Sequence, residues 1–161
     1  MIHRIKKIGS LALITLSLIL TGCTLAPGPA ALSQVALASE INVFRSPTCG
    51  CCGLWIEHMR DAGFQVNDQI TEDMTAVKAQ YDVPDNLKSC HTTVVDGYVV
   101  EGHIPAEDVA RLLTEKPDVA GIAVPGMPIG SPGMESGNYV EPYTVFAFEK
   151  DGSITTFSEH S

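Results

Sequence analysis

The chain has 161 residues, of which 45% are hydrophobic, so it is long and apolar enough to form one domain with a real core. Its 19 acidic residues outnumber its 10 lysines and arginines, which gives a formal net charge of −9. A surface of this sign repels the phosphates of nucleic acids, and the sequence has no basic patch, so composition argues against a nucleic-acid partner.

Residues 1–22 have the layout of a bacterial secretory signal. A basic head precedes the apolar run Ile8–Leu20, which is too short to span a bilayer comfortably. The run ends in "LTGC", which resembles the lipobox of bacterial lipoproteins, so we expect cleavage before Cys23 and lipidation of its sulfur. Ordinary signal cleavage after Ala38, within the small-residue pattern "ALA", is the alternative.

Residues 23–39 are rich in proline and alanine and carry no charge, which predicts a flexible tether. Thr24, and not an aspartate, follows Cys23, and by the sorting rule of bacterial lipoproteins this favours the outer membrane. The lipid would be the only attachment to the membrane. We therefore expect the folded domain, residues 40–161, on the periplasmic face of the bacterial envelope.

The folded domain is predicted to begin with two strands and two helices in alternation. Ile41–Phe44 is typical of a short buried strand, and a helix follows the cysteine-rich loop and ends near Ala62. Phe64–Ile70 alternates between apolar and polar residues like a second strand. Thr71 is the predicted N-cap of a short helix that Pro84 terminates.

A β-hairpin and a third helix are predicted next. Thr92–Val95 and Tyr98–Glu101 flank Asp96-Gly97, a strong signal for a tight turn, and an apolar helical stripe begins after Pro105. The order β-α-β-α-β-β-α predicts a thioredoxin-like α/β fold, with a mixed four-stranded sheet and flanking helices.

The C-terminal part departs from that minimal pattern. Residues 119–139 are rich in glycine and proline without a helical or strand period, which predicts either a functional loop or disorder. Tyr143–Phe148 and Ser153–Phe157 then form a predicted β-hairpin that turns at Asp151-Gly152. We interpret this hairpin as an extension added to the four-stranded sheet.

Cys49 and Cys52 form a C-x-x-C pair where a strand meets a helix N-terminus, a place that stabilises a thiolate. This pair alone would predict a thiol–disulfide oxidoreductase, in which Cys49 attacks and Cys52 resolves. Cys51 argues against a simple catalyst, because a third nucleophile beside the resolving thiol would scramble mixed disulfides. A metal site gains from it, since three sulfurs on one short loop can converge on one centre.

A fourth sulfur is expected to join these three. In thioredoxin-like folds a proline that opens the third strand faces the C-x-x-C mouth, and here His91 occupies that place, preceded by Cys90. Four thiolates select soft or borderline metals. Structural zinc sites usually have two separate C-x-x-C motifs, and iron–sulfur clusters are rare in exported chains. Three crowded cysteines on one loop with a fourth from elsewhere in the chain therefore favour one or several Cu(I) ions.

Four further side chains are weaker candidates for metal ligands. Met127 and Met134, in the repeated P-G-M pattern, would be thioether ligands or part of a lid over the site, or else apolar fillers. His91 is expected at the site through its neighbour Cys90. His103 is more simply interpreted as a surface histidine, with a ligand role as the alternative, and His58 is expected to face solvent.

The sequence resembles the CopG-type periplasmic copper-resistance proteins, which share a thioredoxin-like domain with a Cys-x-Cys-Cys motif. The resemblance rests on "PTCGCCGLW", "SCHTTVVDGYVVEGHIP" and "GIAVPGMPIGSPGME" and runs from about Ile41 to Phe157. It implies copper binding and a role in copper tolerance. The copper ligands that it implies are Cys49, Cys51, Cys52 and Cys90.

We therefore expect an exported protein that holds Cu(I) for copper tolerance, sequestration or transfer. Its expected partners are copper ions and other exported copper-handling proteins. Coupled redox chemistry would be an extension of this role, since thiols reduce Cu(II) while the site holds the Cu(I) formed. The alternatives are an extracytoplasmic thiol–disulfide or copper oxidoreductase that uses Cys49 and Cys52, and a lipoprotein whose cysteines form two structural disulfides.

Overall fold

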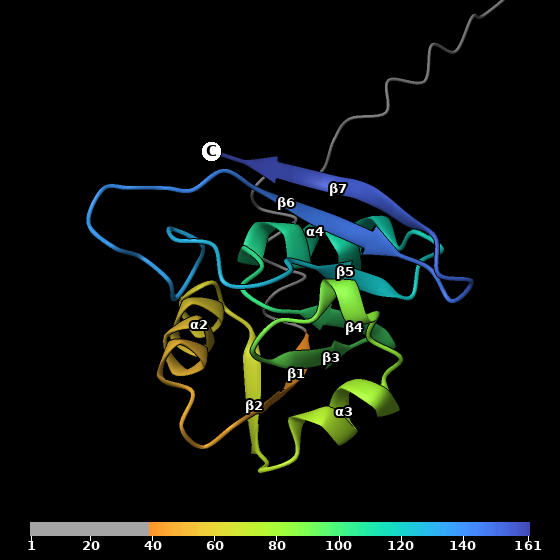
Figure 1. Cartoon of the computed structure of the whole chain (residues 1–161), viewed down its shortest axis with the longest axis horizontal. Helices are drawn as coiled ribbons and strands as arrows, with labels where there is room; N and C mark the ends of the chain where they lie inside the picture. Colours follow the sequence, from red (N-terminus) through yellow and green to blue (C-terminus); the bar gives the residue numbers. More distant parts are fainter. Residues whose placement is uncertain (1–38) are drawn as a thin grey trace, which may run out of the picture.

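One mixed β-sheet runs through residues 39–161, the part of the chain that the computed structural model describes (Figure 1). Its strands are β1 (Glu40–Arg45), β2 (Gln65–Ile70), β3 (Thr92–Val95), β4 (Tyr98–Glu101), β5 (Gly121–Ala123), β6 (Tyr143–Phe148) and β7 (Ile154–His160). They lie in the order β2-β1-β3-β4-β5-β6-β7. The pairs β1–β2 and β4–β5 are parallel, and every other neighbouring pair is antiparallel.

Helical segments cover both faces of this sheet (Figure 1). On one face, α2 (Gly50–Asp61) and α4 (Ala106–Glu115) pack over the larger apolar core, which includes Trp55. On the other face, α3 (Met74–Gln80) and the 3₁₀ helix η1 (Asp85–Leu87) lie over a smaller core. The domain therefore has three layers, with the sheet in the middle.

Local signals account for most of these elements. The β3–β4 turn places Asp96 at φ 48° and Gly97 at φ 85°, the left-handed pair that a two-residue hairpin requires. Helix α4 follows Pro105 and buries the predicted apolar stripe. That stripe consists of Ala106, Val109, Ala110 and Leu113.

The cap of α3 differs from the predicted one. Asp73, not Thr71, is the N-cap, and its Oδ1 accepts a hydrogen bond of 2.9 Å from the backbone N–H of Ala76. The Thr71 hydroxyl instead accepts from the N–H of Asp73 at 3.2 Å. Both residues are good caps by type, and the carboxylate lies closer to the free N–H groups of the first turn.

The prediction of a four-stranded sheet was wrong, because β5 lies inside the glycine- and proline-rich stretch. Its three residues pair in parallel with β4 and antiparallel with β6, so the C-terminal hairpin continues the sheet and is not a separate extension. All three are buried, and a strand this short shows no alternation for sequence reasoning to detect. A Cβ at Gly121 would lie 2.1 Å from the Val99 carbonyl oxygen, so only glycine allows this close strand pairing.

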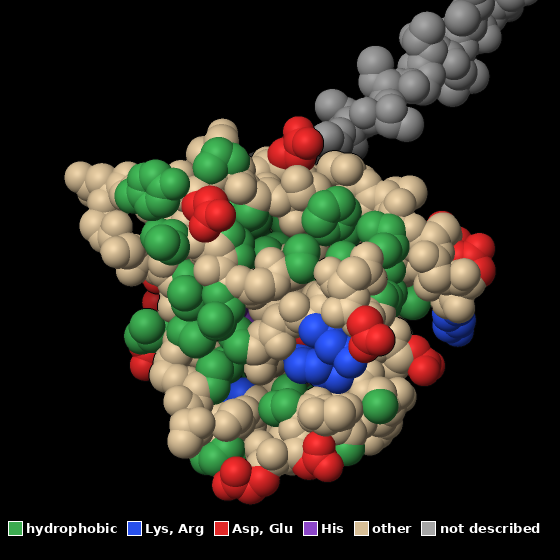
Figure 2. Space-filling view, viewed as in Figure 1, with side chains coloured by type: hydrophobic (Ala, Val, Ile, Leu, Met, Phe, Trp, Pro, Cys, Tyr) green, Lys and Arg blue, Asp and Glu red, His purple; other side chains and the backbone are tan. Residues whose placement is uncertain are grey.

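The predicted signal, the lipobox with Cys23 and the alternative cleavage site at Ala38 lie outside the described residues and remain predictions. Among residues 39–161, every helix is too short or too polar to cross a bilayer. Figure 2 shows acidic side chains scattered over one face of the domain, with hydrophobic side chains gathered between them. On this face the negative charge forms no single concentrated patch.

Candidate metal centre

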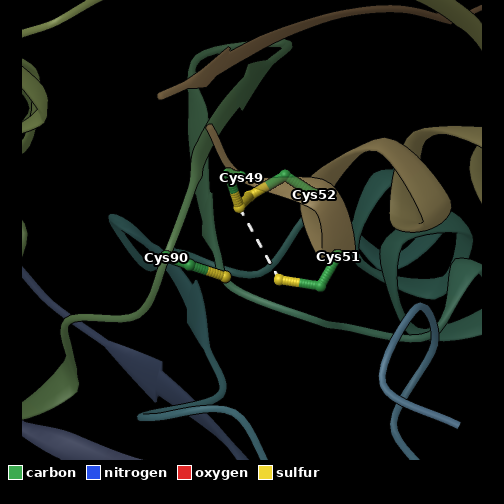
Figure 3. A group of neighbouring side chains, drawn as sticks. All are labelled: Cys49, Cys51, Cys52 and Cys90. Carbon is green, nitrogen blue, oxygen red and sulfur yellow. Dashed lines mark hydrogen bonds between the residues drawn. A yellow bond between two sulfur atoms is a disulfide. The ribbon is translucent and has the colours of Figure 1, made fainter. Parts of the chain in front are cut away.

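The turn between β1 and α2 presents three cysteine sulfurs together (Figure 3). Cys49 is the N-cap of α2, and Cys51 and Cys52 belong to its first turn. Cys49 and Cys52 are joined by a disulfide, with their Cα atoms 5.4 Å apart. Cys52 is fully buried, whereas Cys49 and Cys51 are partly exposed, so the resolving position of the C-x-x-C pair is the protected one.

The segment that leads into β3 brings the fourth sulfur to this turn. Because Phe44 at the end of β1 pairs with Thr92, Cys90 lies beside the residues that follow β1. The Sγ of Cys49 is 3.6 Å from the Sγ of Cys51. We define the cysteine cluster as Cys49, Cys51, Cys52 and Cys90, whose sulfurs all lie within 4.8 Å of one another.

His103 lies at the cluster and is completely buried, so the expectation of a surface histidine was wrong. Its Nε2 is 2.8 Å from the Sγ of Cys90, and its Nδ1 is 2.8 Å from the carbonyl oxygen of Pro132. Because a carbonyl only accepts, Nδ1 carries the proton and the Nε2 lone pair faces the Cys90 thiol. The loop that contains Pro132 covers the ring of His103, and the two residues are 29 positions apart in the sequence.

His91 is also completely buried. Its ring lies between Trp55, at a centroid distance of 4.4 Å, and His103, at 5.0 Å. Its Nδ1 is 3.7 Å from the Cys90 Sγ, and its Nε2 has no hydrogen-bond partner among the described residues. Cys90, His91 and His103 form a second set of donor atoms that lie within 4.8 Å of one another.

Burial favours the neutral forms of these groups. It raises the pKa of the Cys90 thiol to about 12, with a further contribution from the nearby Cys51 thiol. Burial also holds the pKa of His91 well below its usual range and lowers that of His103. A metal ion that binds here must therefore displace a proton from Cys90. Each neutral imidazole, by contrast, has one unprotonated ring nitrogen that can bind a metal without losing a proton.

The metal-free protein is expected to lose stability as the pH falls below about 6.5. Unfolded histidines take up protons near that pH, whereas burial lowers the pKa of His91 and His103 in the folded state, so acid favours unfolding. Below about pH 6.5, each histidine lowers the free energy of unfolding by up to about 1.4 kcal/mol per pH unit of acidification. Well above that pH, neither histidine changes the free energy of unfolding with pH. Urea unfolding between pH 8 and 5 measures this slope, and His91→Gln should make it shallower. A stability that stays flat or rises on acidification would contradict the expectation.

The donor set fits a soft metal ion. A metal–thiolate bond is about 2.3 Å long, so sulfurs up to about 4.6 Å apart can share one ion, close to the spread of the cluster. Thiolates and imidazoles are the ligands that Cu(I) and zinc accept, and no carboxylate belongs to either donor set among the described residues.

Comparison with known proteins identifies the family. A family model described as "Protein of unknown function, DUF411" matches residues 87–134, the segment that contains Cys90 and both buried histidines. A solved structure of "Copper resistance protein copG- Form 2" is 46% identical, covering 76% of this chain and 98% of that chain, with a TM-score of 0.74. The chain belongs to the CopG copper-resistance family. The "Form 1" structure of copG is also 46% identical, covering 75% of this chain and 96% of that chain, with a TM-score of 0.72. No curated protein matches the chain.

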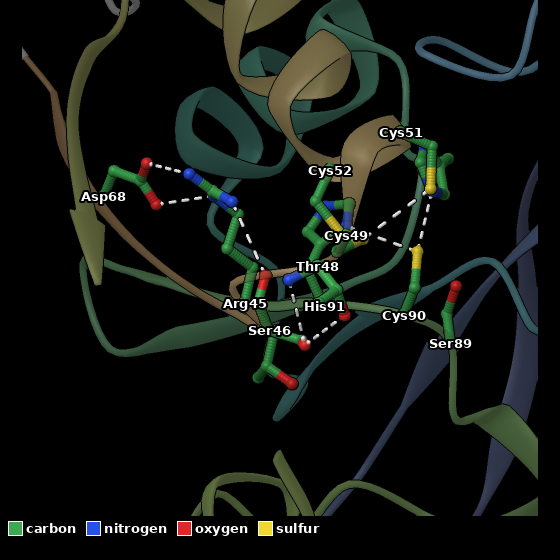
Figure 4. The surroundings of a disulfide bond; sticks show 12 residues. Arg45, Ser46, Thr48, Cys49, Cys51, Cys52, Asp68, Ser89, Cys90 and His91 are labelled. Atoms are coloured by element: carbon green, nitrogen blue, oxygen red, sulfur yellow. Dashed lines mark hydrogen bonds and ion pairs between the residues drawn. A yellow bond between two sulfur atoms is a disulfide. The ribbon is translucent and has the colours of Figure 1, made fainter. Parts of the chain in front are cut away.

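In this member of the CopG family, a bidentate ion pair anchors the strand that leads into the cysteine turn (Figure 4). Arg45 donates to the Asp68 carboxylate at 2.8 and 2.6 Å, which ties the end of β1 to β2. Ser46 and Thr48 hydroxyls lie 3.1 Å apart within the turn, and the N–H of Cys49 donates to the Ser46 carbonyl at 3.2 Å. These contacts fix the path of the backbone before the first sulfur.

A buried charge pair holds the segment that carries Cys90. The Glu101 carboxylate, at the end of β4, accepts hydrogen bonds from the Ser89 N–H at 2.6 Å and from the Thr92 hydroxyl at 2.7 Å, so it ties both sides of the Cys90-His91 dipeptide. The Lys78 ammonium lies 2.5 Å from the same carboxylate. Sequence reasoning missed this pair, although a glutamate ending an otherwise apolar strand was a detectable signal.

The loop between β5 and β6 packs against the first turns of α2. Gly133 has φ +81°. A Cβ at this position would lie 2.7 Å from the backbone nitrogen of Trp55 and 2.8 Å from the backbone carbonyl oxygen of Cys51, so glycine is needed for this contact. Met134 follows it and is partly buried, whereas Met127 is 52% exposed. Lid or ligand roles for both methionines remain predictions.

His58 lies on α2 but does not simply face solvent as predicted. Its side chain is half-buried, and its Nε2 accepts a hydrogen bond of 3.1 Å from the N–H of Ala106. This bond satisfies one free donor at the start of α4, where Pro105 provides no side-chain cap. His58 therefore joins two helices and is not a cluster residue.

Proposed function

We propose that this protein is an exported copper-binding protein that holds Cu(I) on the cysteine cluster, for copper tolerance, sequestration or transfer. The observation that carries the proposal is the convergence of the four sulfurs within 4.8 Å, three from the N-cap and first turn of α2 and one from the segment that leads into β3. Soft thiolates select Cu(I), and membership of the copper-resistance family points to the same metal. Met127 and Met134 are proposed as supporting thioether groups.

The proposal includes coupled redox chemistry at Cys49 and Cys52. Their dithiol would give one electron to each of two Cu(II) ions, form the disulfide and release two protons. The products are two Cu(I) ions, and a reductant is needed to regenerate the dithiol. The presence of a disulfide at this pair is consistent with such a cycle.

The proposed setting is the periplasmic face of the bacterial envelope, where Cys23 would carry a lipid anchor and residues 23–39 would be the tether. We also assign a thioredoxin-like core to β1–β4 and their helices. Its support is the order β2-β1-β3-β4, with β1 and β2 parallel and with β3 antiparallel to both of its neighbours. Other exported copper-handling proteins are the proposed partners.

Anaerobic Cu(I) titration of the fully reduced protein, with metal counted by elemental analysis, tests the proposal. The wild type is expected to bind at least one Cu(I) per chain tightly, and Cys51→Ser is expected to lower the stoichiometry or affinity. Leu54→Ala is a suitable control, because Leu54 lies on the same helix, is 53% exposed and carries no sulfur. A reduced wild-type protein that leaves all Cu(I) on a competing chelator would overturn the proposal.

A second candidate function is thiol–disulfide exchange. The disulfide between a partly exposed Cys49 and a buried Cys52 at a helix N-terminus favours it, because this is the arrangement of an attacking and a resolving thiol. Cys51→Ser leaves the C-x-x-C pair intact, so disulfide exchange should persist in that variant if this function holds. Unchanged copper binding together with persisting exchange activity in Cys51→Ser would reverse the order of the two candidates.

A further inference from the structure

The loop between β5 and β6, residues 124–142, carries much of the exposed apolar surface of the described domain. Six large hydrophobic side chains are exposed among residues 39–161, and four of them lie on this loop: Met127, Ile129, Tyr139 and Val140. In Figure 2 hydrophobic side chains gather over this loop, at the upper left, with an acidic side chain beside them. Apolar side chains that gather in this way, with polar groups at the edge, mark an interaction site.

Hydrogen bonds within the loop hold this apolar surface in place. The N–H of Glu141 donates to the Ile129 carbonyl at 2.8 Å, and the N–H of Ile129 donates to the Glu141 carboxylate at 3.3 Å. A Cβ at Gly130 would lie 2.8 Å from the Cα of Val140, so the two arms of the loop are in contact. We define the apolar patch as Ile129, Tyr139 and Val140. Because these contacts already fix the loop, a partner that binds the patch has little loop entropy to overcome.

A surface hollow of about 490 Å³ begins where the loop enters β6. The residues that line it are Pro142, Tyr143, Thr144, Glu159, His160 and Ser161. Tyr143 pairs with His160 across β6 and β7, and their rings stack at a centroid distance of 4.9 Å. In Figure 1 the end of β7, marked C, lies beside the start of β6, from which the loop extends. The hollow therefore adjoins the arm of the loop that carries the apolar patch.

Carboxylates give the hollow a negative potential. Glu159 is exposed and lines it directly. Burial raises the pKa of Tyr143 to about 12, and the negative charges of Glu107, Asp108 and Glu135 contribute further to this rise. These three carboxylates come from helix α4 and from the loop, so acidic groups approach the hollow from two sides.

The nearby cations leave this potential uncompensated. The Arg111 guanidinium lies 3.4 Å from one Asp108 oxygen and donates to the Phe157 carbonyl at 2.9 Å. The His160 Nε2 lies 2.7 Å from the other Asp108 oxygen. Lys150 is the only lysine or arginine from residue 117 to residue 161, and it lies at the turn end of the β6–β7 hairpin, away from the hollow.

We infer that the apolar patch and the hollow together dock a partner protein that presents a lysine or arginine side chain beside apolar residues. The cationic side chain enters the hollow, where the Glu159 carboxylate and the face of the Tyr143 ring attract it. The apolar neighbours of that side chain cover the patch, with Tyr139 as the central aromatic contact. The inference needs no bound metal, so it and the proposed function can fail separately.

Charge disfavours two other occupants of this surface. A second copy of the chain would bring Glu141 and Glu159 against acidic groups of the same kind, and the loop has no lysine or arginine to compensate them. A lipid surface is also a poor match, because a chain with a net charge of −9 is repelled by anionic headgroups.

Photo-crosslinking in bacterial cells that produce the full chain tests the inference. A photoreactive amino acid is placed at position 139 and, in a matched control, at position 70, where Ile70 is 61% exposed at the end of β2. Position 139 is expected to form a covalent adduct with a second protein. Mass spectrometry of the adduct is expected to find a lysine or arginine flanked by apolar residues in the crosslinked segment, and position 70 is expected to give no such adduct.

A synthetic peptide with the sequence of the crosslinked segment then measures the affinity in vitro by fluorescence anisotropy. Tyr139→Ser and Glu159→Lys are each expected to weaken binding of this peptide by more than about 10-fold. Ile70→Ser removes an equally exposed apolar side chain outside the patch and should change the affinity by less than about twofold. All three variants are expected to bind Cu(I) as the wild type does, which shows that they are folded.

Four crosslinking results overturn the inference: no adduct from position 139, adducts with only a second copy of the chain, adducts with only lipid, or the same adduct from position 70. A crosslinked segment without lysine or arginine, or peptide binding that Glu159→Lys leaves unchanged, overturns it as well. A wild-type protein that docks the peptide but leaves all Cu(I) on a competing chelator would instead defeat the proposed function alone.

Discussion

Glu101→Ala is expected to lower the free energy of unfolding by about 3–5 kcal/mol, the usual result of breaking a buried ion pair from one side. Glu101 is completely buried and Lys78 is 7% exposed, so the variant leaves an ammonium group in the interior without its partner. The Ser89 N–H and the Thr92 hydroxyl lose their acceptor at the same time. Urea unfolding of the metal-free protein at neutral pH measures the change.

The double variant Lys78→Met/Glu101→Leu separates the charge from the positioning role. Replacing both charges with apolar groups of similar size is expected to recover a large part of the stability. It does not restore the two hydrogen bonds that hold the backbone on either side of Cys90, so Cu(I) affinity should stay about 10- to 100-fold below wild type. A double variant that binds Cu(I) as tightly as wild type would show that Glu101 matters only for folding.

Sequence reasoning succeeded where the signal is local. The strand β1, the helix α2 and the β3–β4 hairpin follow from residue periodicity and from turn residues such as Asp96-Gly97. The mixed α/β class follows from the order of these elements. The position of Cys90 beside the cysteine turn also follows, because a strand order inferred from those elements places the start of β3 next to the end of β1.

The errors arose where long-range contacts decide. His103 was expected at the surface because its own neighbours in the sequence do not show that the loop with Pro132 covers it. The three residues of β5 are too few for a period, and only their pairing with β4 and β6 makes them a strand. Lys78 was not singled out in the sequence, because its burial depends on two distant partners, the Thr92 hydroxyl and the Glu101 carboxylate.

The candidate site was predictable in its sulfurs and less so in its surroundings. Three cysteines within four positions are a rare pattern whose chemistry is evident without coordinates. The division into a bonded and a free pair was not evident, because it depends on which sulfurs the helix turn and β3 bring together. The fixed tautomer of His103 likewise depends on a carbonyl far away in the sequence.

Cys90→Ser is expected to weaken Cu(I) binding by the reduced protein by more than about 10- to 100-fold and to lower the number of ions bound per chain. Cys90 is the only sulfur of the cluster that does not come from the N-cap or the first turn of α2, and it is the one that His103 contacts. A serine hydroxyl is a hard and weak ligand for Cu(I), although it is close to a thiol in size. Met74→Leu is the matched control, because Met74 begins α3 on the other face of the sheet and the change removes a sulfur outside the cluster.

The pH dependence of binding should change in the same variant. The pKa of the Cys90 thiol is raised to about 12, so Cu(I) must displace a full proton from it at any pH between 6 and 9. This residue alone therefore raises the apparent Cu(I) affinity by up to about tenfold for each unit of rising pH. The affinity rises with pH because the Cys90 thiol must lose its proton before its sulfur binds the ion. Competition titrations at several pH values should show one proton fewer released per chain in Cys90→Ser than in wild type. Equal proton release in the two proteins, or an affinity loss no larger than that of Met74→Leu, would mean that Cys90 is not a copper ligand.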